Sequence, residues 1–150
     1  MSDNWLTVIP TDPYWQPDEP TVDATVKVLQ RFVPAANRIE VVEGTSVEFV
    51  DAGENFLSVC CPHCGAESTM DWWIGAMDRA ADRGFTDLAT EVSCCGARVS
   101  LNDLDYDWPQ GFTRWRIRVL EPNRLQLERA EIQTLAATLD HPIRVIYTRY

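Results

Sequence analysis

Five cysteines carry the clearest chemistry of this 150-residue chain, and they fall into two groups: Cys60, Cys61 and Cys64, then Cys94 and Cys95. Adjacent cysteines make a poor disulfide framework, because a bridge needs a particular spacing and orientation of the two side chains. Two thiolates three positions apart, as in Cys61 and Cys64, can reach one tetrahedral metal ion across a tight turn. The clustering therefore favours metal binding.

The residues around the cysteines sharpen this prediction. Cys61-Pro62-His63-Cys64-Gly65 resembles the first knuckle of a zinc ribbon, and Cys94-Cys95-Gly96 resembles a contracted second knuckle. A full second knuckle would place cysteine at position 92, where this chain has Val92. The resemblance covers about residues 56–101 and implies one structural Zn²⁺. The predicted ligands are Cys61, Cys64, Cys94 and Cys95, and the alternatives for the fourth position are Cys60 and His63.

Three other uses of these thiols stay open: buried free thiols, a redox dithiol and a catalytic zinc site. A redox Cys-x-x-Cys is typical of a βαβ context that this region lacks. Catalytic zinc keeps one open coordination position and usually involves histidine, whereas four thiolates close the site and the chain has two histidines. Structural zinc is therefore the leading hypothesis.

The charge of the chain restricts its partners. The net charge is −10, and residues 1–108 alone hold 19 acidic and 6 basic side chains. This acidity argues against general binding to a nucleic-acid backbone, since that affinity comes from Lys and Arg. A solvated acidic surface is the simplest interpretation. The sharper hypothesis is an acidic face that docks a basic protein, attracted over long range.

The sequence also predicts the cellular compartment of the protein. No apolar run approaches the roughly 20 residues that a membrane helix needs. The first residues, Met-Ser-Asp-Asn-Trp, lack the basic and apolar regions of an export signal. We therefore expect a cytoplasmic protein with no membrane contact, in a reducing compartment where clustered thiols bind metal.

Two loops and one predicted helix carry further candidate contact residues. Aromatic side chains are favoured in protein interfaces and ligand pockets, although packing in the core is their simpler role, and the acidic residues of the second loop could face a basic partner. The candidates for partner binding are Trp15, Trp72, Asp103, Asp105, Asp107 and Trp108. Residues 103–114 do not form a calcium loop, because Trp108 stands at its sixth position and Arg114 at its twelfth.

Three arginines near the start of the C-terminal third are predicted to form a row on one strand. Arg114, Arg116 and Arg118 alternate with apolar residues, so they share one face of a half-buried strand. An RNA-binding sheet would also show stacking aromatic residues there, and Trp115 points to the opposite side. We expect the arginines to pair with Glu40 and other acids on neighbouring strands.

Hydrophobic periodicity predicts the elements that position these residues. Strands are predicted at 5–9, 38–43, 46–51, 55–60, 113–120 and 143–150, with short strands within 86–93 and 97–101. Helices are predicted from Thr21 or Asp23 to about 32, from Ser68 or Asp71 to Gly84, and at 125–139. Gly44 is expected to end the strand at 38–43, and residues 102–111 are expected to form a loop.

The order of these elements predicts the fold. A strand, a helix and a strand occur at both ends of the chain, which is the arrangement of a ferredoxin-like split βαβ fold. We expect one α+β domain over residues 1–150, with an antiparallel sheet and two helices on one face. A zinc-knuckle module is expected as an insertion at residues 45–111.

Taken as a whole, the chain resembles a group of uncharacterised bacterial proteins. The resemblance depends on four segments: Cys61-Pro62-His63-Cys64-Gly65, Cys94-Cys95-Gly96, Leu101-Asn102-Asp103-Leu104 and Asp107-Trp108-Pro109. It implies no established activity. The excess of arginine, 12 against Lys27 alone, is typical of a GC-rich bacterial genome.

No nucleophile elbow, phosphate loop or His-Glu-x-x-His motif is present, so the sequence favours a non-enzymatic protein. The leading hypothesis is a zinc-stabilised module that binds a basic protein, for example an immunity protein that neutralises a toxin such as a nuclease. The first alternative is a small-molecule-binding protein or enzyme that uses the aromatic loops. The second alternative is a zinc ribbon associated with nucleic acid. The sequence leaves the oligomeric state open.

Overall fold

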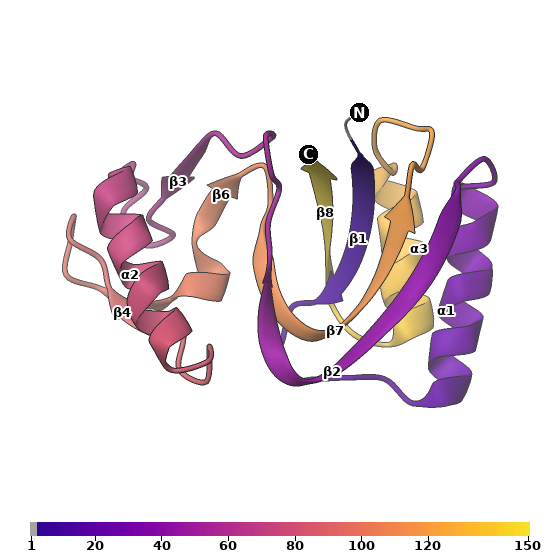
Figure 1. Ribbon diagram of the computed structural model, residues 1–150, viewed down its shortest axis with the longest axis horizontal. Coiled ribbons are helices and arrows are strands. Elements are labelled where there is room, and N and C mark those ends of the chain that lie inside the picture. The colour runs from indigo at the N-terminus through magenta and orange to yellow at the C-terminus, as the bar shows by residue number, and fades with distance from the viewer. Residues whose placement is uncertain (1–2) are drawn as a thin grey trace.

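A computed structural model describes residues 3–150, and its fold is α+β (Figure 1). The outer parts of the chain form one four-stranded antiparallel sheet in the order β2-β7-β1-β8. Its strands are β1 (Asn4–Pro10), β2 (Arg38–Val50), β7 (Gly111–Leu120) and β8 (Ile143–Arg149). The helices α1 (Glu19–Phe32) and α3 (Arg129–Leu139) lie side by side on one face of this sheet.

The elements between β2 and β7 are smaller. They are β3 (Ser58–Cys60), α2 (Met70–Asp82), β4 (Ala89–Glu91), β5 (Arg98–Ser100), a 3₁₀ turn (Leu101–Asp103) and β6 (Asp105–Asp107). β3 pairs with β6, and β4 pairs with β5, in two separate antiparallel ribbons. They lie beyond the face of the large sheet that carries no helix (Figure 1).

Two apolar clusters explain this division. Leu6, Ile117 and Val119 of the sheet are completely buried against α1 and α3. A second cluster gathers Val59, Cys61 and Val92 around α2. Strands β2 and β7 extend into both clusters, and the register between them shifts between Glu43 and Glu48. The long β2–β7 ribbon therefore joins the sheet to the cysteine-bearing region.

Several predicted boundaries are wrong. β2 continues through Gly44, which lies at the irregular part of the ribbon, and the strand predicted at 55–60 is only Ser58–Cys60. The supposed loop at 102–111 contains β6, because β3 offers it a pairing edge. The predicted helix at 125–139 begins only at Arg129, where Glu128 and Glu131 form a capping box, and Leu125 before it is 94% exposed.

The helix starts also differ from prediction. The cap of α1 is Asp18, whose carboxylate accepts the Thr21 N–H, so the helix starts before the predicted cap residues. The cap of α2 is Thr69, whose hydroxyl accepts the Trp72 N–H at 3.2 Å. Both caps satisfy an otherwise free N–H of the first turn.

Among the residues that the structure describes, no helix is long and apolar enough to cross a membrane.

Candidate metal centre

Two short hairpins hold the cysteines. In the first hairpin, residues 60–67, Cys60 pairs with Glu67 through an antiparallel bridge. In the second hairpin, residues 91–98, Glu91 of β4 pairs with Arg98 of β5. Both ends of the second hairpin follow the first by 31 residues, so the two can be aligned position by position.

The two turns have the same backbone hydrogen bonds. In the first hairpin, the N–H of Cys61 donates to the carbonyl of Ala66 at 2.8 Å, and the N–H of Gly65 donates to the carbonyl of Cys61 at 2.9 Å. The aligned residues of the second hairpin make the same two bonds, each at 3.0 Å, with Val92 in the place of Cys61. The hairpins are therefore two copies of one turn.

Glycine is required at the end of each turn. Gly65 has a φ of 79° and Gly96, its aligned partner, has a φ of 71°. This left-handed region brings a Cβ close to the following carbonyl, so only glycine adopts it freely. The glycine that follows each cysteine group in the sequence is thus explained by the backbone.

Four thiols from the two turns converge. All Sγ atoms of Cys61, Cys64, Cys94 and Cys95 lie within 4.8 Å of one another. Sγ of Cys64 lies 3.3 Å from that of Cys94, and Sγ of Cys61 lies 3.9 Å from that of Cys95. Four sulfurs at the usual 2.3 Å from one tetrahedral ion would be about 3.8 Å apart. The group could therefore hold a metal ion.

The alignment explains the missing cysteine at position 92. Cys61 and Val92 occupy equivalent positions, and each side chain is 1% exposed in the second cluster. Cys64 is equivalent to Cys95, whereas Cys94 is equivalent to His63. The fourth thiol thus comes from a different point of the turn. Neither alternative ligand, Cys60 or His63, belongs to the cluster that residues 3–150 form.

The four thiols have unequal acidities. The backbone N–H of Cys64 points at Sγ of Cys61 at 3.5 Å and lowers the pKa of that thiol to about 6, with a further N–H from His63 at 3.3 Å. The hydrogen bond with Cys64 and burial raise the pKa of Cys94 to about 12. The protein thus favours one thiolate by itself. A bound dication would offset the repulsion among four.

Acidic side chains gather beside the first hairpin. Asp105 and Asp107 are exposed on β6, with Tyr106 buried between them, and Asp105 is paired with Cys60. Glu67 lies on the other side of Cys60. Burial raises the pKa of the Cys60 thiol, and Asp105, Glu67 and Asp107 raise it further. We call Glu67, Asp105 and Asp107 the acidic surface.

The structure places the other candidate contact residues in different surroundings. Trp15 stacks on His141 with ring centroids 4.1 Å apart, and Trp72 packs against the second cluster. Trp108 is 38% exposed and meets Tyr147 edge to face at 6.3 Å. Asp103 is exposed at the end of the 3₁₀ turn. Of the three tryptophans, Trp108 offers the most surface to a partner.

Two arginines of the row meet acids on β2, as expected, whereas Arg114 has a neutral partner. Arg118 meets Glu40 at 2.6 Å, and Arg116 meets Glu48 at 3.3 Å. Arg114 donates through two nitrogens to Gln16, at 2.7 and 3.1 Å. The guanidinium of Arg118 also lies 4.6 Å from the ring centroid of Trp5. An aromatic side chain therefore does share this face, contrary to the expectation from Trp115.

One set of hydrogen bonds, around Arg144 and Asn102, was not predicted from the sequence. Nη1 of Arg144 donates to the carbonyls of Asn102 and Gln110, at 2.9 and 2.8 Å. The Asn102 amide donates to Thr11 and accepts the N–H of Phe112. These bonds hold the 3₁₀ turn against β7, β8 and the residue that follows β1. Only the polar residues Asn102 and Arg144 inside apolar segments could have signalled it.

Comparison with known proteins adds no relative: no family model, no curated protein and no solved structure matches the chain.

Proposed function

We propose that Cys61, Cys64, Cys94 and Cys95 bind one structural Zn²⁺ that holds the two hairpins together. The observation that carries this proposal is the convergence of four Sγ atoms within 4.8 Å of one another, from two turns of the same backbone geometry. Four thiolates in a tetrahedron suit zinc, or iron as the competing metal. They leave no open position, which favours a structural role over a catalytic one.

We also propose that the large sheet and its two helices form a ferredoxin-like split βαβ fold. The strand order β2-β7-β1-β8, with one helix after β1 and another after β7, supports a ferredoxin-like split βαβ arrangement. The paired hairpins support a zinc-ribbon-like insertion within the predicted module at residues 45–111. The metal would stabilise this insertion, whose strands are only three residues long.

The biochemical role that we propose is non-enzymatic binding of a basic protein at the acidic surface. Its members Glu67, Asp105 and Asp107 are exposed and make no ion pair within residues 3–150. Unpaired carboxylates that a rigid scaffold holds together attract cationic partners and orient them. An immunity protein that neutralises a basic nuclease is one concrete form of this role.

Native mass spectrometry of protein purified without chelator tests the metal. We expect one added zinc mass per chain, lost after acidification because protonated thiols do not bind it. Elemental analysis distinguishes zinc from iron. Protein without metal, or with iron alone, contradicts the zinc assignment.

A pair of double variants tests the binding role. Asp105→Asn/Asp107→Asn removes two charges from the acidic surface, and Asp78→Asn/Asp82→Asn removes two from exposed positions of α2. After a partner is captured from an extract of the native host, its Kd is measured against salt. We expect binding to weaken at higher salt and in the Asp105→Asn/Asp107→Asn variant. Binding should be unchanged in the Asp78→Asn/Asp82→Asn variant. A Kd that ignores salt contradicts docking through this surface.

A further inference from the structure

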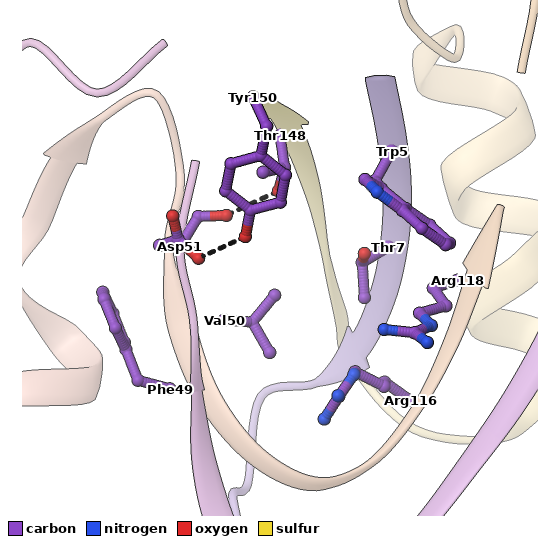
Figure 2. A pocket seen from close by; sticks show the side chains of 9 residues that line it. All are labelled: Trp5, Thr7, Phe49, Val50, Asp51, Arg116, Arg118, Thr148 and Tyr150. Atoms are coloured by element: carbon purple, nitrogen blue, oxygen red, sulfur yellow. Dashed lines mark hydrogen bonds between the residues drawn. The ribbon is translucent and has the colours of Figure 1, made fainter. Parts of the chain in front are cut away.

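A concave cavity lies on the face of the large sheet opposite the helices, apart from the thiol cluster (Figure 2). Trp5 and Thr7 of β1, Arg116 and Arg118 of β7, and Tyr150 at the end of the chain line it. The side chains of Phe49 and Val50 form the facing wall, where the β2–β7 ribbon curves back (Figures 1 and 2).

Strand alternation explains why this face is polar. Leu6, Ile117 and Val119 point to the helices and are completely buried, so the intervening residues point the other way. Among those intervening residues are Thr7 and Arg116, both of which line the cavity. Two arginines two positions apart thus stand side by side with both guanidinium groups in one hollow (Figure 2).

These guanidinium groups have donors to spare. The Arg116 side chain is 14% exposed and has one ion pair, from Nη1 to Glu48 at 3.3 Å. Arg118 uses Nε for Glu40, and its guanidinium lies over the Trp5 ring. A guanidinium carries five N–H donors, so most of these donors have no protein partner among the described residues. Both arginines line the cavity.

The acceptors in the wall are already engaged. Oδ1 of Asp51 accepts the hydroxyl of Tyr150 at 2.9 Å, and Oδ2 accepts the N–H of Gly53 at 3.0 Å. The carbonyl of Asp51 accepts the hydroxyl of Thr148 (Figure 2). Asp51 therefore fixes the wall and the Tyr150 ring. The cavity as a whole offers an excess of directed donors between aromatic and aliphatic surfaces.

We propose that this cavity binds a small organic acid, with its carboxylate on Arg116 and Arg118 and its apolar body between Trp5 and Tyr150. A planar carboxylate matches the fork of a guanidinium with two parallel hydrogen bonds. This ligand site goes beyond the proposed function, since it involves neither the thiols nor the acidic surface.

The size of the cavity restricts the ligand. Its volume is about 90 Å³. A closed cavity of roughly 150 Å³ holds one benzene ring, so this smaller hollow takes in the carboxylate and part of the ring of a benzoate-sized acid. The rest of such a ligand would lie at the open mouth of the hollow.

An NMR titration with sodium benzoate at constant ionic strength tests the site. The readout is the indole N–H signal of Trp5, which the variant Trp5→Phe assigns. We expect a saturable shift with a Kd in the millimolar range. Acetate, which lacks the apolar body, should bind at least about tenfold more weakly.

Matched arginine variants locate the carboxylate. Arg116→Gln should weaken benzoate binding about ten- to hundredfold, and Arg116→Lys should weaken it less because it keeps the charge and loses the fork. Arg114→Gln removes one charge from the same strand and face but lies outside the cavity, so it should bind as the wild type does. Melting curves establish that each variant is folded at the titration temperature.

Three results would overturn the proposal. The first is the absence of a saturable Trp5 shift with benzoate. The second is equal weakening by Arg114→Gln and Arg116→Gln, which would indicate attraction by net charge alone. The third is that inorganic phosphate binds as tightly as benzoate. The site would then bind oxyanions in general and would not select an organic acid.

Discussion

The two cysteine hairpins have the same backbone and different side chains. Residues 60–67 and 91–98 share two turn hydrogen bonds and a left-handed glycine. The buried position after the first strand is Cys61 in one hairpin and Val92 in the other. The first turn supplies its second sulfur from Cys64, and the second turn supplies adjacent sulfurs from Cys94 and Cys95.

The four sulfurs therefore converge because the two turns share one backbone geometry, and not because the cysteines share one spacing. The side chain at position 92 fills the second cluster, so an apolar residue is sufficient there. The residue two positions later lies at the tip, 3.3 Å from Sγ of Cys64 in the facing turn. A cysteine at the tip can therefore replace one at the base.

The largest expected effect comes from removing the equivalent thiols Cys64 and Cys95. Either Cys64→Ser or Cys95→Ser should lose the zinc, because a serine hydroxyl does not replace a thiolate. A structural zinc contributes on the order of 10 kcal/mol to folding, so both variants should melt far below the wild type. Native mass spectrometry and thermal melting measure the two results.

Cys60→Ser is the matched control for this loss. It removes a neighbouring thiol outside the cluster and should keep one zinc and the melting temperature. Loss of zinc in this variant, or full zinc in Cys64→Ser, would refute the ligand set.

The next effect tests the equivalence of positions 61 and 92 directly. Cys94→Ser should lose zinc, and adding Val92→Cys should restore it by placing the sulfur at the base of the turn. We expect the restored zinc affinity to come within about a hundredfold of the wild type, since the surrounding packing was built for valine. A chelator competition measures it. If the double variant binds no better than Cys94→Ser, the alignment of the hairpins does not extend to the site.

A smaller effect is expected at the two glycines. Gly65→Ala and Gly96→Ala should each reduce the free energy of unfolding of the zinc-bound protein by about 1–2 kcal/mol, since alanine strains at positive φ. Apart from the adjacent residues, no heavy atom of the described part of the chain lies within 3.4 Å of a Cβ built at either position, so the cost is conformational and should be similar. Denaturant unfolding measures it.

Gly75→Ala, in the middle of α2, is the control with the opposite sign. Alanine is favoured over glycine by about 1 kcal/mol in a helix. Clearly unequal costs at Gly65 and Gly96 would mean that the two turns are not equivalent.

The smallest effect concerns Cys60, which has the acidic Glu91 as its aligned partner. Burial and the charge of Asp105 raise the pKa of the Cys60 thiol, so less thiolate is present at pH 8 and alkylation is slow. Asp105→Asn removes a negative charge, lowers this pKa and should speed alkylation by about two- to fivefold. Mass spectrometry of iodoacetamide-treated zinc protein follows the reaction. An unchanged rate would mean that the charge of Asp105 does not contribute to the pKa of Cys60.

Much of the architecture follows from local patterns. The alternation at 113–120 predicts β7, and Gly84 ends α2 with a φ of 62°, as expected. Errors arose where a partner decides the structure. β6 exists because β3 pairs with it, and β2 runs through Gly44 because β7 pairs with β2 on both sides of the irregular stretch between Glu43 and Glu48. Leu125 has helical spacing but stands exposed, because α3 begins only after it.

The spacing of Cys61 and Cys64 beside a glycine was enough to predict a tight turn and a candidate metal site, because two thiols three positions apart can reach one tetrahedral ion. The sequence by itself also determined which residues of β7 are buried, because side chains alternate along a strand. The tertiary structure was needed to place Cys94, rather than Cys60 or His63, in the thiol cluster, and to bring Glu67 and Asp105 beside Cys60. It was also needed to place Trp5 and Arg116 in one cavity. These contacts join residues that are distant in sequence. They depend on strand register and on the curvature of the β2–β7 ribbon, which local periodicity does not specify.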